Sequence, residues 1–453
     1  MKGVRNFEAQ TESESSDRRK YRNSRVFYCI EAALEYFIAI MVGETYLAKI
    51  ASELGVSDAV TGVLYAFVSL GSAFQIFAIF LANKTPVKRW ITSLHIINQL
   101  AFTLVYAIPL FDLSNKIKIA FFIVFLLMGQ ILTNIANPAK INWFMSLVDD
   151  SQRGRFTAKK EILSLMGGMI FSFVMGNVID YYEAKGSIRT AFLIGVITVF
   201  CLMVLHTLML LLSVEKPTEH KTKHIGAELK NLLRNKPLLR VIGVSTIWYI
   251  TNYMTTPFYG SYRINELGFT MTFCSVLAMI YSIVRSCFSA PMGRLADKRG
   301  FSNMLSICFL IQGVAFLINV FTVPSNGTIF YTAFYILNAV AMAGINSAQI
   351  NLVYDYVRVD MRTGAFALSH AISGVSGFLI TLMISPLVTY IQKQGNVFLG
   401  IPMYAQQLLS FFGVIMMVVA MLYIKFILTN KKKEICHEQR VFKSIQSSPR
   451  GGH

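Results

Sequence analysis

The sequence predicts an all-α membrane protein with twelve transmembrane helices in two pseudo-symmetric six-helix halves. Three observations predict this fold class: long apolar runs, basic residues gathered on one side of the membrane, and an internal repeat. Of the 453 residues, 54% are hydrophobic and 15% are charged, whereas about 25% of an average soluble domain is charged. A soluble chain this apolar would need polar linkers between separate domains, and the sequence has none.

The apolar runs have the length of membrane-crossing helices. Runs of about 20 apolar residues cross a hydrocarbon core of about 30 Å, and examples are residues 190–213, 301–321 and 407–427. In chain order, the twelve spans are expected at residues 26–50, 57–82, 88–110, 117–146, 156–181, 188–213, 239–263, 269–292, 300–322, 327–353, 364–390 and 404–428.

The basic residues indicate which side of the membrane each loop occupies. Twelve spans place both termini on one side, and 34 of the 42 lysines and arginines fall in the tails and loops of that side. Cytoplasmic loops carry such an excess of basic residues, so both termini are predicted to be cytoplasmic and the protein to reside in the cell membrane. The formal charge of +18 comes from these scattered loops and does not indicate a nucleic-acid partner.

The domain boundaries follow from the spans. We expect a disordered cytoplasmic tail without a cleavable signal peptide, a first half, a linker, a second half and a second cytoplasmic tail, over residues 1–25, 26–213, 214–238, 239–428 and 429–453. In the linker, Ile225, Leu229, Leu232 and Leu233 share one side of a possible helix. An interfacial helix on the inner leaflet and a flexible basic tether both explain this pattern.

An internal repeat relates the two halves. Residues 137–168 align with residues 346–377 at a constant shift of 209, with nine of 32 positions identical. The aligned segments connect spans 4 and 5 in the first half, and spans 10 and 11 in the second. They predict two halves of the same orientation, related by an axis along the membrane normal, as in some alternating-access transporters.

A charged octapeptide, GRLADKRG, lies at residues 293–300 between spans 8 and 9. Its pattern G-x-L-A-D-[KR]-x-G resembles the loop signature of the major facilitator superfamily and is carried by Gly293, Leu295, Ala296, Asp297, Lys298 and Gly300. Twelve spans, two halves and a cytoplasmic linker fit the same resemblance over nearly the whole chain. The matching loop of the first half, LANKTPVKRW, departs from the pattern, with Asn83 in place of the acid and Pro86 in place of a glycine.

The octapeptide predicts a latch between the halves. Gly293 and Gly300 allow a tight turn, and Asp297 can approach a helix N-terminus, where the helix dipole favours an anion. The resemblance implies that this helix is the start of span 5, where the nearby cations are Arg153 and Arg155. In the alternative interpretation there is no latch, and the loop is only oriented by the charges of Arg294, Lys298 and Arg299.

Two acids lie in the first span. Glu31 and Glu35 are one helical turn apart, and Glu35 is expected roughly 13 Å into the bilayer. Ionisable residues at such depth are costly and mark functional sites, and two neighbouring carboxylates resist double ionisation. We therefore expect a proton-coupling site at Glu31 and Glu35. Alternatively, Glu31 only stabilises the helix start and Glu35 pairs with a basic residue.

The resemblance also implies that spans 1, 4, 7 and 10 line a central cavity. The candidate substrate ligands are polar and aromatic residues of these spans: Glu35, Gln130, Asn134, Trp248, Tyr249, Asn252, Tyr253, Asn346 and Gln349. Amides and aromatic rings at helical spacing suit a neutral or amphipathic solute. For any single amide, hydrogen bonding between helices is the competing explanation.

Several activities have no motif in the sequence. It contains no GxxxxGK[ST] loop for ATP, no HExxH zinc motif and no cluster of cysteines and histidines, so we expect no cofactor, no metal and no enzymatic activity. His95, His206 and His370 are isolated in the sequence and are interpreted as packing residues. Arg285, within span 8, is expected to pair with an acid of the protein or to bind an anionic substrate.

Together these features predict a monomeric secondary active transporter that moves a small organic solute across the lipid bilayer by alternating access, coupled to protons. Efflux of amphipathic compounds is the first interpretation, because 35 Phe and 20 Tyr accompany few cavity charges. Uptake of a nutrient such as a sugar or a peptide is the second. An alternative of another class is a receptor or lipid-handling scaffold that transports nothing.

Overall fold

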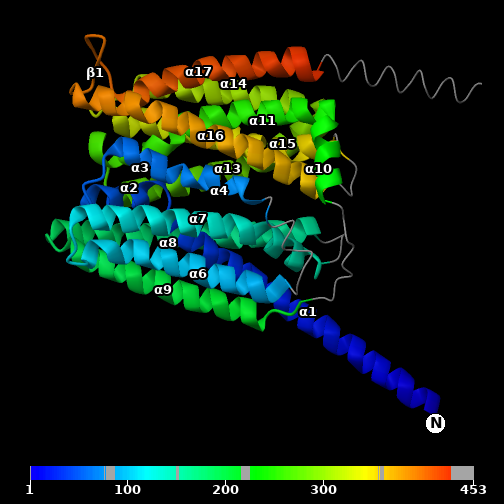
Figure 1. Ribbon diagram of the computed structural model, residues 1–453. Coiled ribbons are helices and arrows are strands. Elements are labelled where there is room, and N and C mark those ends of the chain that lie inside the picture. The colour runs from blue at the N-terminus through cyan, green and yellow to red at the C-terminus, as the bar shows by residue number, and fades with distance from the viewer. Residues whose placement is uncertain are drawn as a thin grey trace, which may run out of the picture.

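The computed structural model describes residues 2–75, 77, 87–148, 153–215, 225–355, 357 and 362–429. Long helices lie side by side in a single bundle (Figure 1). The helices up to residue 212 are α1 (Lys2–Met41), α2 (Glu44–Glu53), α3 (Asp58–Tyr65), α4 (Phe67–Ala73), α6 (Val87–Ala107), the 3-10 turn η1 (Ile108–Leu110), α7 (Asn115–Met145), α8 (Arg153–Ala184) and α9 (Ile188–Leu212).

The rest of the chain begins with a short helix, α10 (Ile225–Arg234), and continues through a broken helical segment. That segment contains α11 (Lys236–Thr255), η3 (Thr256–Phe258), α12 (Tyr259–Ser261) and the π-helix η4 (Tyr262–Glu266). The remaining elements are α13 (Met271–Arg299), α14 (Phe301–Val320), α15 (Gly327–Asp355), α16 (Arg362–Lys393), a hairpin of β1 (Val397–Phe398) and β2 (Ile401–Pro402), α17 (Ala405–Tyr423) and the π-helix η6 (Ile424–Thr429).

The described helices account for most of the predicted spans. Within the described residues, nine helices are long and apolar enough to cross a membrane, or ten if the bent pair 21–41 and 44–53 forms one span. The second predicted span begins as the shorter apolar helix 58–73, and residues 78–82 of that span lie outside the described part. The seventh corresponds to α11, whose charged first turn and polar residues lower its apolar character. The count of twelve therefore stays a prediction.

The helix surfaces agree with a membrane environment. Large apolar side chains point outward along the helices, such as Met383 at 73% exposed, Ile170 at 66% and Ile329 at 74%. A water-soluble bundle would bury such side chains, because each costs about 1.5–3 kcal/mol when left in water. In a bilayer the same side chains contact lipid tails at no such cost. The chain is a multi-pass membrane protein.

Buried residues divide the helices into two groups. One large apolar core is built only from residues 232–428. Two other cores lie among residues 28–210, and the larger of them also includes Met271. We call the helices α1 to α9 the first group and α11 to α17 the second group. In Figure 1 the first group is blue to green and the second is green to red.

The internal repeat is visible in the helix boundaries. The repeat mates Arg153 and Arg362 begin α8 and α16, and each of these helices has 32 residues. The helices that precede them in the chain are α7 and α15, as the aligned segments predict. Corresponding segments therefore fold in the same way in the two groups.

Two local features differ from, or refine, the predictions. The helix α1 begins at Lys2, whereas a disordered tail was expected up to residue 25; a helix that the membrane span has nucleated extends at little cost. The linker does form a helix, α10, with Leu232 buried in the core of the second group and Leu233 exposed. Contact of α10 with a lipid surface stays a prediction.

Candidate functional site

A cavity of about 410 Å³ lies between the two groups. Its first-group wall comes from α1, the beginning of α2, Tyr65 and α8, and its second-group wall comes from residues 252–263, α13 and α15. Six tyrosines line it: Tyr36, Tyr46, Tyr65, Tyr259, Tyr281 and Tyr335. A cavity shared by two helix groups changes shape when the groups move relative to each other, as alternating access requires.

One end of the cavity is closed by an ion pair between the groups. Glu44 is the first residue of α2, and its carboxylate contacts the Arg263 guanidinium of η4. Arg263 also donates from Nε to the Tyr259 carbonyl at 3.2 Å and from Nη1 to the Tyr335 hydroxyl at 3.4 Å. The position of Glu44 follows from the chain break between α1 and α2, which bends the helix axis by 41°.

Further polar contacts join the groups at the same end. The Asp58 carboxylate of α3 accepts from Asn265 at 2.6 Å and from Gln392 of α16 at 2.9 Å. Asp180 of α8 accepts from the backbone N–H groups of Met271 and Thr272, at 2.9 and 2.7 Å, and so caps the start of α13. We call this set, with Glu44 and Arg263, the closed end; it lies where α2 and α3 are drawn in Figure 1, away from the labelled N-terminus.

A carboxyl group at the closed end has a shifted protonation equilibrium. Glu266 lies beyond the predicted end of span 7 and accepts a hydrogen bond from Gln392 at 2.8 Å. Burial raises the pKa of the Glu266 carboxyl to about 7, and the charge of Asp58 adds to this effect, whereas the Gln392 amide opposes it. The closed end thus contains a group that changes charge near neutral pH.

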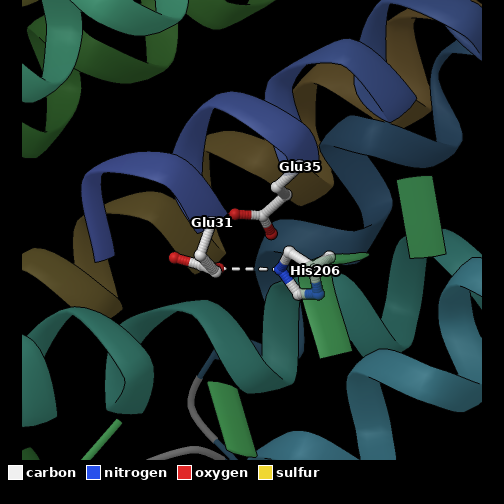
Figure 2. Close-up of side chains that lie close together, drawn as sticks. All are labelled: Glu31, Glu35 and His206. Atoms are coloured by element: carbon white, nitrogen blue, oxygen red, sulfur yellow. Dashed lines mark hydrogen bonds and ion pairs between the residues drawn. The ribbon is translucent and has the colours of Figure 1, made fainter. Parts of the chain in front are cut away.

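The predicted acids of the first span lie in a buried cluster. Lys140 of α7 donates to Glu31 Oε1 at 2.6 Å and also contacts Glu35. The imidazole Nε2 of His206, from α9, lies 2.8 Å from Glu31 Oε1, and His95 Nδ1, from α6, lies 3.9 Å from Glu35 Oε1. Figure 2 shows Glu31 and Glu35 projecting from α1 toward the His206 ring. Four helices of the first group therefore meet at one charge cluster.

The cluster is almost closed to solvent and has an uneven charge. The side chains of Glu31 and His206 are 0% exposed and that of Lys140 is 3%, whereas Glu35 is 23% exposed. Two carboxylates face one ammonium, so the cluster lacks one positive charge when both histidines are neutral. The side-chain atoms of Glu31, Glu35 and His206 that could ligate a metal ion lie within 4.8 Å of one another. Because the Lys140 ammonium already contacts both carboxylates, we interpret the cluster as an acid–base network.

The span 7 candidates have different environments. Asn252 lines the cavity and accepts from Thr256 at 3.0 Å. Trp248 is 4% exposed and stacks on Phe309 inside the second-group core. Tyr249 and Tyr253 stack on each other beside the cavity, and Tyr249 bonds His370 Nδ1 at 3.0 Å. Of these four candidates, only Asn252 is among the described residues that line the cavity.

The candidate amides of spans 4 and 10 also lie outside the cavity lining, although Asn338 of span 10 lines it. Asn134 donates to the Gln130 carbonyl at 2.9 Å and accepts from Gln75 at 3.1 Å, which are contacts within the first group. Gln349 belongs to a small pocket with Tyr249 and His370, and Asn346 is half-buried in α15. In this structure these residues do not lie together at one site. Their role as substrate ligands stays a prediction.

The octapeptide forms the end of a helix. Residues 293–299 continue α13, and Gly300, at φ 82°, makes the turn into α14. Gly293 is therefore helical, and of the two glycines only Gly300 makes the predicted turn. Asp297 is exposed, and the side chains of its predicted partners Arg153 and Arg155 lie outside the described residues, so the latch stays a prediction. Arg285, farther back in α13, lies 3.9 Å from Glu161 of α8.

Several charged or titratable residues of these sites are not among the residues predicted from the sequence, and five of them are instructive. Lys140 and Arg263 fall inside predicted spans but close to their ends, where a basic residue is typical of a loop. His95 and His206 looked isolated because their partner, α1, is far away in the sequence. Glu44 gave the same signal as Glu35, an acid inside an apolar span, and that signal could have identified it.

Comparison with known proteins agrees with this architecture. The family model described as Major Facilitator Superfamily matches residues 28–381 and again residues 242–438. The chain belongs to the major facilitator superfamily. An uncharacterized MFS-type transporter of Methanocaldococcus jannaschii is 26% identical over 194 residues, which cover 39% of this chain and 46% of that relative. The match thus spans less than half of the curated relative's length.

Solved transporters share the fold of this superfamily member. An aspartate-to-alanine mutant of the nucleoside transporter NupG aligns with a TM-score of 0.70 and 14% identity, covering 90% of this chain and 100% of that one. An auto-inhibited POT family peptide transporter gives a TM-score of 0.66 and 13% identity, covering 89% and 97%. A D-xylose–proton symporter gives 0.62 and 15%, also covering 89% and 97%. At such identities, the likeness concerns the fold alone.

Proposed function

We propose that this superfamily member is a secondary active transporter that moves a small organic solute by alternating access, coupled to protons. The observation that carries the proposal is the 410 Å³ cavity between the two groups, with a buried acid–base cluster on the same helix that forms part of its wall. Glu35 belongs to the cluster, and the next residue, Tyr36, lines the cavity. A change of charge in the cluster is therefore adjacent to the solute.

The charge balance of the cluster supports a proton as the coupling ion. One positive charge is missing, and an uncompensated charge inside a membrane protein is costly, so proton binding is favoured when the cluster is sealed. His206 Nδ1 accepts from the Gln99 amide at 3.0 Å in the neutral ring. If the Gln99 amide turns over, its oxygen accepts from Nδ1–H, and the ring can then carry the proton. Glu35, which is partly exposed, is the second proton site.

Efflux of amphipathic compounds is the favoured direction and substrate class, because six tyrosines line the cavity. Uptake of a nutrient remains the second candidate, since solved neighbours include a peptide transporter and a D-xylose–proton symporter. Transport sidedness separates the two. A scaffold that moves no solute is the third candidate, and counterflow tests it directly.

The decisive experiment uses the full chain in proteoliposomes and a panel of labelled amphipathic, peptide and sugar solutes. We expect counterflow of at least one solute and its accumulation when a pH gradient is imposed. In Glu35→Gln, accumulation driven by the gradient should be lost while counterflow persists, because the cavity stays intact. Glu183→Gln is the matched control, since it removes a 48%-exposed glutamate that pairs with Lys49. Absence of counterflow across the panel would overturn the transport proposal, and gradient-driven accumulation in Glu35→Gln would overturn the coupling site.

A further inference from the structure

Within the described part of the chain, two charged residues line the cavity, and their side chains are exposed to different extents. Glu44 and Arg263 contact each other across the two groups. The Glu44 side chain is 22% exposed, whereas that of Arg263 is 2% exposed. A solute that enters the cavity therefore meets more of the carboxylate than of the guanidinium. The accessible charge of the cavity is negative.

Arg263 has partners that remain if Glu44 is engaged elsewhere. Its Nε donates to the Tyr259 carbonyl, and its Nη1 to the Tyr335 hydroxyl. The guanidinium carbon also lies 5.6 Å from the centre of the Tyr335 ring, within the range of cation–π attraction. Among the described residues, the side chain of Glu44 has no hydrogen-bond partner besides Arg263. The partners Tyr259 and Tyr335 keep Arg263 hydrogen-bonded when Glu44 pairs with another cation.

The rest of the wall is suited to a cation. Tyr36, Tyr65, Tyr281 and Tyr335 line the cavity together with Glu44. Tyrosine faces attract cations, and a carboxylate among such faces is the chemistry that recognises an ammonium group. Asn252 and Asn338 add amide oxygens to the same cavity. An anionic solute would instead face the Glu44 carboxylate and a covered arginine.

We propose that the cavity binds a solute with a protonated amine, whose ammonium pairs with Glu44 in competition with Arg263, and that this exchange loosens the closed end. The inference rests on the proposed transport function and deepens it by naming a substrate class. The Glu44–Arg263 pair ties the two groups together, so a cation that takes over Glu44 removes one of the contacts at the closed end. By linkage, the state with this end open binds the amine more tightly.

Binding of matched trios of compounds tests the recognition. We would use several aromatic and aliphatic scaffolds, each as a primary amine, a neutral alcohol and a carboxylate, for example tryptamine, tryptophol and indole-3-propionate. Affinity is measured with the purified full chain by the ligand-induced shift of the unfolding temperature and by equilibrium binding. We expect at least one amine to bind about tenfold more tightly than its alcohol. In Glu44→Gln this preference should disappear, and in Glu183→Gln, the matched control, it should persist.

A second variant keeps the test informative if Glu44→Gln does not fold. Arg263→Gln leaves Glu44 without its competitor, so amine affinity should rise severalfold, whereas a merely structural role of Arg263 would lower the affinity for all three compound classes alike. If every amine binds no better than its alcohol, or if Glu44→Gln keeps the preference, the amine site is overturned.

The exchange itself is tested by spin labels at Glu53→Cys and Lys393→Cys in a cysteine-free background. These positions lie in different groups beside the closed end. The amine should lengthen the distance between the labels, and its alcohol should not; an unchanged distance with bound amine overturns the exchange. Counterflow in the same proteoliposomes separates this inference from the proposed function. Transport of alcohols or carboxylates without preference for the amine overturns only the amine site, whereas absence of counterflow overturns the transport function.

Discussion

Lys140 shows how one residue can tie a membrane bundle together. Its ammonium contacts Glu31 and Glu35, so α7 is held to α1 by a charge pair inside an apolar core. Its repeat mate in the second group is Gln349, an amide, and the Gln349 Nε2 is buried without a hydrogen-bond partner in this structure. The same position thus carries a charge in one group and none in the other. Proton chemistry, in our proposal, belongs to the first group.

Removing the ammonium should destabilise the protein strongly. In Lys140→Met, Glu31 keeps only His206 as a partner at 0% exposure, and breaking a buried ion pair costs about 3–5 kcal/mol. Thermal unfolding of the purified protein measures the loss. Lys116→Met, an exposed substitution, is the control and should change stability by less than about 0.5 kcal/mol. Adding Glu31→Gln to Lys140→Met should recover part of the loss, and a double variant that is no more stable would contradict the pairing.

Glu266 should make the closed end sensitive to pH. The closed state keeps the Glu266 proton up to about pH 7, whereas an open, hydrated carboxyl releases it near pH 4.3. The closed state therefore binds more protons between these values, so low pH favours closure and this advantage is lost as the pH rises through 7. The distance between labels at residues 53 and 393 should increase from pH 6 to pH 8, with a midpoint near 7. In Glu266→Gln the distance should not depend on pH in this range, and an unaltered midpoint would refute the assignment.

At the scale of elements, α8 and α13 form an antiparallel pair with one acid near each end. Asp180, near the end of α8, caps the start of α13. Asp297, near the end of α13, is the residue predicted to cap the start of α8. The first contact is formed in this structure, and the second is the predicted latch. Both contacts obey the same rule, that a carboxylate is stabilised at a helix N-terminus.

These two acids should have opposite effects on the conformational equilibrium. In Asp180→Asn the charged carboxylate, which accepts from two N–H groups through its two oxygens, is replaced by a neutral amide with one oxygen. This change weakens the closed end, so the distance between labels at residues 53 and 393 should increase. Asp297→Asn weakens the predicted latch at the other end and should favour the state described here, with the label distance unchanged or shorter. Equal responses of the two variants would exclude the latch.

A glycine permits the close approach of α12 to α2. A Cβ built on Gly260 would lie 2.3 Å from the backbone oxygen of Glu44, and backbone cannot move aside as a flexible side chain can. Gly260→Ala should therefore disfavour the closed end by about 1–3 kcal/mol and lengthen the same label distance. Gly313→Ala is the control, because its Cβ would meet nothing nearer than 3.5 Å. If the label distance in both variants equals that of the unsubstituted protein, the close approach of α12 to α2 does not control closure.

At the scale of the whole molecule, polar contacts between the groups gather at the closed end. Further bonds between the groups include two along α4 and α16, where Ser69 donates to the Gly374 carbonyl at 2.8 Å and Ser72 to the His370 carbonyl at 3.1 Å. The closed end is remote from the N-terminus in Figure 1. If the termini are cytoplasmic, as the basic loops predict, the closed end faces outward.

This sidedness can be measured without knowing the substrate. A tag on the N-terminus should be cleaved by an added protease in inverted membrane vesicles and protected in right-side-out cells. A cysteine at Lys393 should show the reverse pattern with an impermeant thiol reagent. A tag that is cleaved from the outside of intact cells would reverse the predicted orientation and, with it, the state of the transporter.

The sequence by itself determined the membrane class, most of the spans, the repeat and the family. These properties depend on composition, on whether apolar segments are long enough to cross the bilayer, and on residues at constant spacing. All of these can be determined from the sequence of one chain. It also singled out Glu31 and Glu35, because an acid within an apolar span is conspicuous wherever its partner lies.

Only the tertiary structure decided which charges meet. Lys140, His95 and His206 approach Glu31 and Glu35 from three other helices, and Glu44 meets Arg263 across 219 residues of chain. Helical spacing shows which residues share a face, but the rotation and the neighbours of each helix are set by packing throughout the bundle. For this reason Trp248, which shares span 7 with the cavity residue Asn252, lies in the core of the second group.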